Sequence, residues 1–159
     1  MNIKVNRKEL VNTKDALKKE WMRKQLNIEI TISEGSRYID DVNKRKIKEY
    51  SLSSQNRRKF LMYCIRAHLE RDYLLVTKLI NLIGISRAAA ETMIKECEAA
   101  GWIIVERGNK NERKIQASDV TVETYKEYCD WLWAIINNSE MRSLSASITE
   151  IEKLEHPNY

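Results

Sequence analysis

Apolar residues recur every three or four positions along most of this chain, a spacing typical of amphipathic helices. The clearest stripe lies between residues 86 and 100, and it consists of Ala90, Met93, Ile94 and Cys97. Helices are also predicted at 7–26, 36–50, 55–71, 75–83 and 120–136, with a last one that carries Met141, Leu144, Ile148 and Ile151. The fold class is therefore expected to be mainly α.

A small hairpin is predicted after the 86–100 helix. Residues 102–107 and 113–117 have strand character, and the polar segment 108–111 joins them. Gly84, Gly101 and Gly108 fall at three successive breaks, between two helices, between helix and strand, and between the two strands, and each is expected to serve its turn. The order helix, tight turn, helix, hairpin is that of a winged helix-turn-helix with additional N- and C-terminal helices.

The chain divides into three predicted parts. Residues 1–52 form a basic, helical extension in which Ile28, Ile30 and Ile32 alternate with polar residues, a pattern that favours a short strand at 27–33, with a continuing helix as the other interpretation. Residues 53–118 form the winged helix, in which we expect DNA to bind. Residues 119–159 form C-terminal helices that are expected to dimerise.

Charge is distributed unevenly along the 159 residues, although the net charge is only +5. The first 60 residues contain 16 basic and 8 acidic residues, whereas the segment after residue 117 contains 3 and 8. A basic front and an acidic tail indicate one surface that attracts polyanions and another that does not. Solvated basic helices are common, so charge alone does not identify a nucleic-acid partner.

Few features of the sequence suggest catalysis or a cofactor. The three cysteines, Cys64, Cys97 and Cys129, are widely spaced at apolar helix positions, which favours buried thiols in a reducing cytoplasm over a disulfide framework or a zinc site. His68 and His156 are not at metal-ligand spacing, and there is no glycine-rich phosphate loop. No stretch approaches the length of a membrane span. We expect no enzyme activity, no cofactor and no membrane partner.

The segment 55–136 resembles the MarR family of transcriptional regulators. The resemblance lies in Leu79, Leu82, Gly84, Ile85, Ser86 and Arg87, in the stripe Met93, Ile94 and Cys97, in Gly101, and in the wing sequence Asn111-Glu112-Arg113-Lys114-Ile115. Two positions depart from the family pattern: Ile80 replaces an alanine, and Asn111 replaces the acidic wing residue. The resemblance implies a homodimer, held together by terminal helices, that binds double-stranded DNA.

In such a fold the helix 86–100 is expected to lie in the major groove of DNA, with its N-terminal side chains nearest the bases. Arg87 is expected to reach guanine or a phosphate, and the wing is expected to reach phosphates or the minor groove. Among the wing residues Arg113 matches the family's arginine. The predicted DNA-binding residues are Ser86, Arg87, Ala88, Ala89, Glu91, Thr92, Lys95, Arg107, Lys110, Arg113 and Lys114.

A dimer interface is predicted along the C-terminal helices. Apolar residues there are spaced by three and four, and large side chains outside that seam imply a second buried face, although both helices folding back on their own domain is the alternative. The predicted dimerisation residues are Val122, Tyr125, Cys129, Leu132, Trp133, Ile136, Leu144, Ile148 and Ile151.

A second function remains open on the sequence. Glu91, Glu96 and Glu98 place negative charge on the predicted recognition helix, and this charge opposes DNA. The alternative is an adaptor whose winged helix binds a protein partner in transcription or replication machinery. An adaptor predicts a stable protein complex with weak, unspecific DNA affinity, whereas a regulator predicts specific, salt-sensitive DNA binding.

Overall fold

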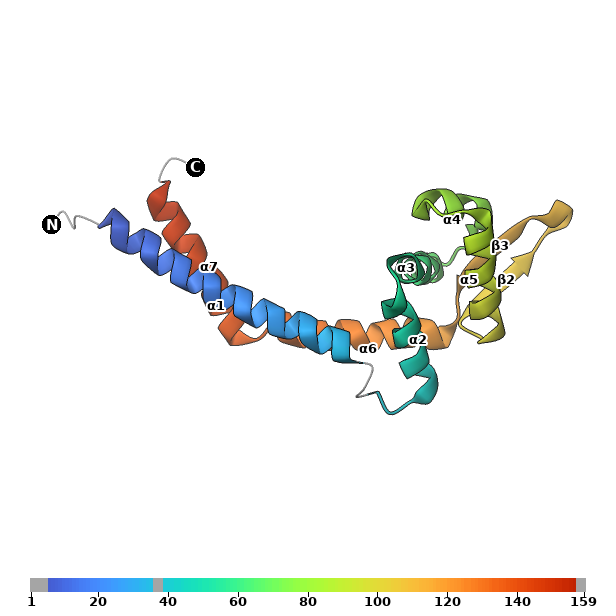
Figure 1. Cartoon of the computed structure of the whole chain (residues 1–159), viewed down its shortest axis with the longest axis horizontal. Helices are drawn as coiled ribbons and strands as arrows, with labels where there is room; N and C mark the ends of the chain where they lie inside the picture. Colours follow the sequence, from blue (N-terminus) through green and yellow to red (C-terminus); the bar gives the residue numbers. More distant parts are fainter. Residues whose placement is uncertain (1–5, 36–38, 157–159) are drawn as a thin grey trace. The chain divides into compact units, whose positions relative to one another are not determined.

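A computed structural model describes residues 6–35 and 39–156 of the chain (Figure 1). The chain divides into two compact units, one formed by residues 1–34 with 129–159 and the other by 35–128. In chain order the elements are α1 (Arg7–Glu34), α2 (Val42–Ser53), α3 (Gln55–Leu69), β1 (Leu74–Leu75), α4 (Val76–Ile83), α5 (Arg87–Ala99), β2 (Ile103–Arg107), a short 3-10 turn (Asn109–Asn111), β3 (Arg113–Ala117), α6 (Asp119–Ile136) and α7 (Ser139–Glu155).

Unit 35–128 is built around α3, which packs on α2, α4, β1 and β3. Phe60 and Cys64 on this helix are fully buried, as is Leu79 on α4. The same core takes in the apolar face of α5 together with Trp102, Ile103, Ile115 and Ala117 of the hairpin segment. Helix α5 and the hairpin are thus held against one continuous core, which fixes the two elements expected to meet DNA.

The sheet is antiparallel, with strand order β1-β3-β2. Val105 of β2 lies opposite Ile115 of β3, and Leu74 of β1 lies on the other side of the same residue. Side chains alternate across a strand, so Ile115 and Ala117 face the core while Lys114 and Gln116 face the other side. The mainly α fold with a small β wing that the sequence predicted is confirmed.

The turn between α4 and α5 has the local chemistry of a helix-turn-helix. Gly84 ends α4 with φ 75° and ψ 39°, the left-handed conformation that glycine adopts without steric cost. Ile85 follows, and the Ser86 hydroxyl accepts a hydrogen bond of 3.1 Å from the Ala89 N–H, which caps α5. The chain therefore passes from α4 to α5 in three residues, and the Ser86 side chain satisfies one of the free amides at the start of α5.

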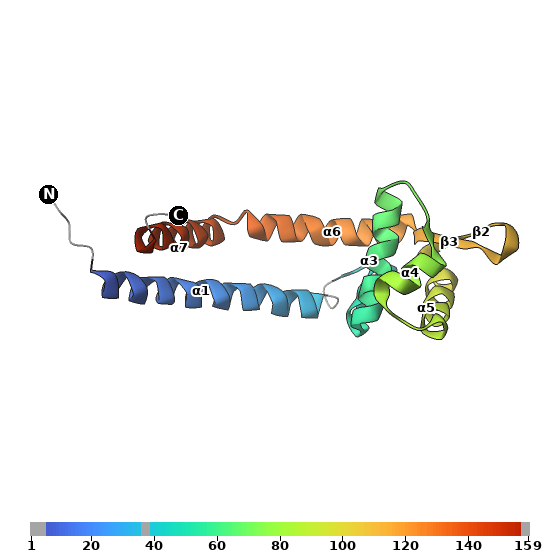
Figure 2. The same cartoon turned by 90° about the horizontal axis from the view of Figure 1, so that it is seen from above.

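Unit 1–34 with 129–159 contains the antiparallel helix pair α1 and α7, which lie side by side in both views (Figures 1 and 2). Three ion pairs mark their register: Lys14 with Glu155, Lys18 with Glu152 at 2.8 Å, and Lys24 with Glu140 at 2.9 Å. None of the residues described in α1 or α7 is buried. This pair therefore has no core of its own.

The prediction of a short strand at 27–33 is wrong, because α1 runs through this segment. Ile28 and Ile32 are half-buried, four residues apart, and continue the stripe that begins with Leu10, Lys14, Leu17 and Trp21. Ile30 is exposed. The alternation of Ile28, Ile30 and Ile32 therefore does not reflect a strand. Burial along α1 follows the helical period.

Three local expectations also need correction. Leu75, the first residue of the predicted helix 75–83, lies in β1 opposite Lys114, and the apolar residue Leu82 of that helix is exposed. Gly108 is not the left-handed residue of the wing turn, since its φ is −93°; Lys110 and Asn111 adopt positive φ instead. The predicted helix at 36–50 begins at Val42, and residues 36–38 lie outside the described residues.

Gly84→Ala is expected to lower the free energy of unfolding by about 1 kcal/mol, because alanine is strained at positive φ while its Cβ would meet nothing within 4 Å. Gly108→Ala is the matched control. Its backbone is extended and the nearest atom to the new Cβ lies at 3.5 Å, so little change is expected. Urea denaturation of both variants tests this; equal losses would contradict it.

Candidate nucleic-acid interface

Helix α5 presents a face to solvent because its opposite face is committed to the core. Ala90, Met93, Ile94 and Cys97 are buried. By helical periodicity the residues opposite this stripe point outward. Those residues are Ala88, Thr92 and Lys95, all exposed, together with Arg87, whose side chain is 77% exposed at the first turn.

The outward face of α5 has small side chains at its centre and positively charged side chains at its ends. Thr92 donates its hydroxyl to the Ala88 carbonyl at 3.1 Å, so in this rotamer its oxygen is left as an acceptor. Lys95 makes no ion pair within the described residues. Ala88 and Ala89 add no bulk. A helix with such small side chains can approach a groove of DNA closely. The cations Arg87 and Lys95 lie toward the two ends of this face.

The acidic residues of α5 lie on its flanks, and the wing pairs with two of them. Both carboxylate oxygens of Glu91 accept from the Arg113 guanidinium, with Nη1 to Oε2 at 2.9 Å. Seven residues later on the same flank, Glu98 accepts from Arg107 at 3.0 and 3.1 Å. Such two-point contacts fix geometry as well as charge. Arg107 and Arg113 also lie opposite each other across the hairpin.

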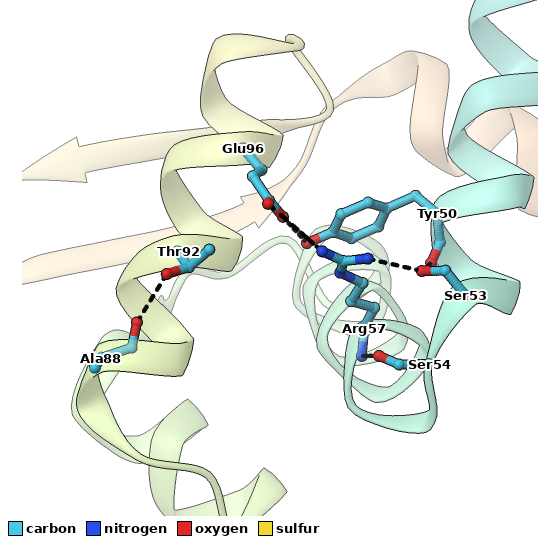
Figure 3. A network of polar contacts seen from close by, with 7 residues as sticks. All are labelled: Tyr50, Ser53, Ser54, Arg57, Ala88, Thr92 and Glu96. Atoms are coloured by element: carbon cyan, nitrogen blue, oxygen red, sulfur yellow. Dashed lines mark hydrogen bonds and ion pairs between the residues drawn. The ribbon is translucent and has the colours of Figure 1, made fainter.

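The third acidic residue, Glu96, lies on the other flank and meets the α2–α3 junction (Figure 3). It accepts a 3.0 Å hydrogen bond from the Tyr50 hydroxyl, and Arg57 lies 3.5 Å away. Arg57 also donates to Ser53 and stacks over the Tyr50 ring at 4.8 Å. All three glutamates on which the adaptor hypothesis depended are therefore paired with an arginine in this structure.

The contacts between α5 and the wing shift the pKa of Glu91, Arg113 and Arg107. The hydrogen bond from Arg113 lowers the pKa of Glu91, and Glu91 in turn raises the pKa of Arg113. Glu98 raises the pKa of Arg107 in the same way. The contact with Arg113 thus favours the ionised form of the Glu91 carboxylate.

The wing residues named from the sequence occupy different positions. Lys110 is exposed at the tip, Arg107 is largely exposed, and Lys114 is half-buried on the sheet face away from α5. Arg113 is the least open of the predicted DNA-binding arginines, with only 23% of its side chain exposed. The residue that matches the family's wing arginine is thus engaged by α5 in this structure.

The residues predicted to dimerise differ in their exposure. Trp133 and Ile136 of α6 are exposed, Trp133 at 69%. Leu144, Ile148 and Ile151 are half-buried positions of α7, the helix that pairs with α1 of the same chain. On the core side of α6 the buried residues are Thr121 and Thr124, and the Thr121 hydroxyl donates to the Trp102 carbonyl at 2.7 Å. Val122, the first residue of the predicted seam, is half-buried and packs against this core, whereas Tyr125 is exposed.

Sequence reasoning did not find the partners of the acidic residues, although signals were present. The period of two in 113–117 places Arg113 on the same strand face as Ile115 and Ala117, which is the face turned to the core. Glu91 and Glu98 are seven apart, hence on one flank of a helix. The partnership of Glu96 with Tyr50 and Arg57 joins residues about 40 positions apart and had no local signal.

The described residues also bear on three further features: a metal site, a membrane-spanning helix and a reactive thiol. Within the described residues no group of three His, Cys, Asp or Glu residues is arranged to hold a metal ion, and no helix is long and apolar enough to cross a bilayer. Cys64 and Cys97 are buried, as the sequence predicted, whereas Cys129 is only half-buried. Burial raises the pKa of the Cys97 thiol to about 11. Thiols of this kind are poor nucleophiles at neutral pH.

Comparison with protein-family models found no match, and comparison with curated proteins found none either. Among solved structures the chain is similar to the heme sensor protein PefR from Streptococcus agalactiae in complex with heme (11% identity, TM-score 0.45, covering 82% of this chain and 92% of that one). It is also similar to disulfide-formed AbfR (17%, 0.44, 90% and 97%) and to a MarR protein from Peptoclostridium difficile (18%, 0.40, 83% and 88%). The last of these neighbours has the name of the family that the sequence resembles.

The Glu91–Arg113 pair predicts a specific pH response. Because the folded-state pKa of Glu91 is lowered, its contribution to stability is present above the ordinary glutamate pKa of 4.5 and is lost as pH falls through the folded value. A carboxyl-detected NMR titration is expected to show Glu91 titrating below 4.5. Arg113→Gln is expected to move that midpoint up; an unchanged midpoint would show that the pair does not form in solution.

Proposed function

We propose that this chain is a sequence-specific, double-stranded DNA-binding transcriptional regulator that acts as a homodimer. Helix α5 enters the major groove, with Arg87, Ala88, Thr92 and Lys95 facing the DNA, and the wing contacts the backbone or the adjoining minor groove. The observation that carries the proposal is the outward face of α5, where small and basic residues are exposed and each acidic residue is paired with an arginine.

Electrostatics support DNA as the partner. A helix that carries three glutamates would be repelled by phosphates if those charges were unpaired. The pairs with Arg57, Arg107 and Arg113 remove most of that repulsion and leave Arg87, Lys95 and Lys110 as charges available to a polyanion. The N-terminus of α5, capped by Ser86, adds the positive end of the helix dipole to the same region. No observation in the described residues favours a protein-only role for this surface.

The helix pair α1–α7 supports a dimer. Two helices with no buried residue between them do not bury enough apolar surface to be stable alone, so a further partner is needed to cover them. Exposed apolar residues on the same unit supply the surface: Met22, Leu26 and Ile30 are four apart on α1, and Trp133 and Ile136 end α6. A second copy presents the same apolar surface, and two-fold pairing covers both.

A dimer contributes two α5 helices, one from each copy, to the proposed DNA site. Two-fold symmetry of the protein requires a target with inverted symmetry, with half-sites about one helical turn of DNA apart. Selection from a random duplex pool tests the proposal, and a symmetric enriched motif is the expected result. Absence of any enriched motif at low salt would overturn it.

Lys95→Ala is expected to weaken binding to all duplexes alike and to reduce the slope of log K against log salt by about one, because one phosphate contact is lost. Lys153→Ala removes the same charge from α7 and serves as the control, with no change in slope expected. Fluorescence anisotropy at several salt concentrations measures both. An equal effect of the two variants would place the DNA-binding surface elsewhere.

Trp133→Glu and Met22→Glu are each expected to shift the protein from dimer to monomer at micromolar concentration, because each puts a charge into the proposed apolar interface. Val42→Glu makes the same change at an exposed apolar residue of α2 and is expected to leave the dimer intact. Sedimentation equilibrium distinguishes the states. If all three variants remain dimeric, the interface does not involve these residues.

A further inference from the structure

We propose that Glu91 is the residue through which α5 recognises a cytosine, and that Arg113 is a positioning residue that holds the Glu91 carboxylate rather than a DNA contact. The inference rests on the proposed function. It assigns a specificity-determining role to an acidic side chain and removes the wing arginine from the set of phosphate contacts.

The first argument is position. Glu91 lies one turn after Arg87, with Arg87 Nε 4.0 Å from its carboxylate, and one turn before Lys95. It thus belongs to the N-terminal half of α5, where a recognition helix meets base edges. Its side chain is 40% exposed, whereas that of Arg113 is 23% exposed. The carboxylate is therefore the more accessible member of the pair.

The second argument is the geometry of the pair. The Arg113 guanidinium donates a hydrogen bond to each carboxylate oxygen of Glu91. This two-point contact restricts the side-chain torsions of Glu91 and offsets its charge. Arg113 lies on the sheet face that carries Ile115 and Ala117, and that face is turned to the core. Each oxygen retains a lone pair after accepting one bond from the guanidinium, so the carboxylate can still accept a hydrogen bond from DNA.

The third argument is base chemistry. An ionised carboxylate only accepts hydrogen bonds, and cytosine presents its N4 amino group as a donor in the major groove. Guanine presents the acceptors N7 and O6, and thymine presents O4. Adenine has a donor at N6, but its N7 acceptor lies beside that donor and repels a carboxylate. Cytosine is thus the base that Glu91 fits.

Glu98 offers a matched comparison. It is paired with Arg107 by the same two-point contact on the same flank of α5, but it lies two turns further along, near the C-terminus of the helix. It is therefore expected to be too far from the bases to read one. Position along α5, not pairing as such, separates the two glutamates.

The test is selection of binding sites from a random duplex pool by full-length wild type, Glu91→Gln and Glu98→Gln, each checked for an unchanged melting temperature. Wild type and Glu98→Gln are expected to enrich a cytosine at the same position of each half-site, preferred about tenfold over other bases. Glu91→Gln is expected to lose that preference or shift it to adenine, because an amide matches adenine N6 and N7. Retention of the cytosine in Glu91→Gln overturns the proposal.

The role of Arg113 is tested by adding Arg113→Gln to wild type and to Glu91→Gln and measuring affinity for the selected duplex across salt concentrations. A positioning residue predicts a loss of about tenfold in the wild-type background, less than about twofold in Glu91→Gln, and an unchanged salt slope. A direct phosphate contact predicts equal losses in both backgrounds and a slope smaller by about one. That second result overturns the role proposed for Arg113.

The outcomes separate the two proposals. If the wild type enriches no motif and binds no duplex, the proposed function itself fails. If it enriches a symmetric motif that Glu91→Gln leaves unchanged, DNA binding stands and only the reading of cytosine by Glu91 fails.

Discussion

The buried face of α5 is the constraint on which the proposed interface depends. Ala90, Met93, Ile94 and Cys97 are committed to the core around α3, and this fixes the rotation of the helix about its own axis. Because that rotation is fixed, the residues on the opposite side of α5 face solvent. A polar substitution in the buried stripe is therefore expected to disturb the proposed DNA interface without changing any residue of its outward face, because the stripe sets the rotation of α5.

Paired charge has two roles on this surface. The arginines of the hairpin and of α3 cancel the glutamates of α5, and the same contacts tie the hairpin and α3 to the helix. The pairs are partly exposed, so each contributes little to stability by itself. Their effect on orientation is larger, because a two-point arginine–carboxylate contact fixes both partners. The relative placement of α5 and the wing thus depends on side chains as well as on the shared sheet and core.

The two units differ in how they bury apolar surface. Unit 35–128 has a closed core in which Phe60, Leu79 and Ile115 are fully buried, and it meets the ordinary requirement for an independently stable domain. The α1–α7 pair has ion pairs along its length and no buried residue among those described. Its stability is therefore expected to depend on association, so that folding of these helices and dimerisation are linked by mass action.

The sequence alone predicted the order of the helices, the hairpin and the turn at Gly84, because each is a local consequence of periodicity or backbone freedom. It erred where local patterns competed: three alternating isoleucines suggested a strand, but half-burial along α1 follows the helical period. It also could not assign a partner to Glu91, Glu96 or Glu98, and it therefore treated the recognition helix as acidic. Only the tertiary structure brings Arg57, Arg107 and Arg113 to that helix, because which charges meet is decided by the packing of distant segments and not by their spacing in the chain.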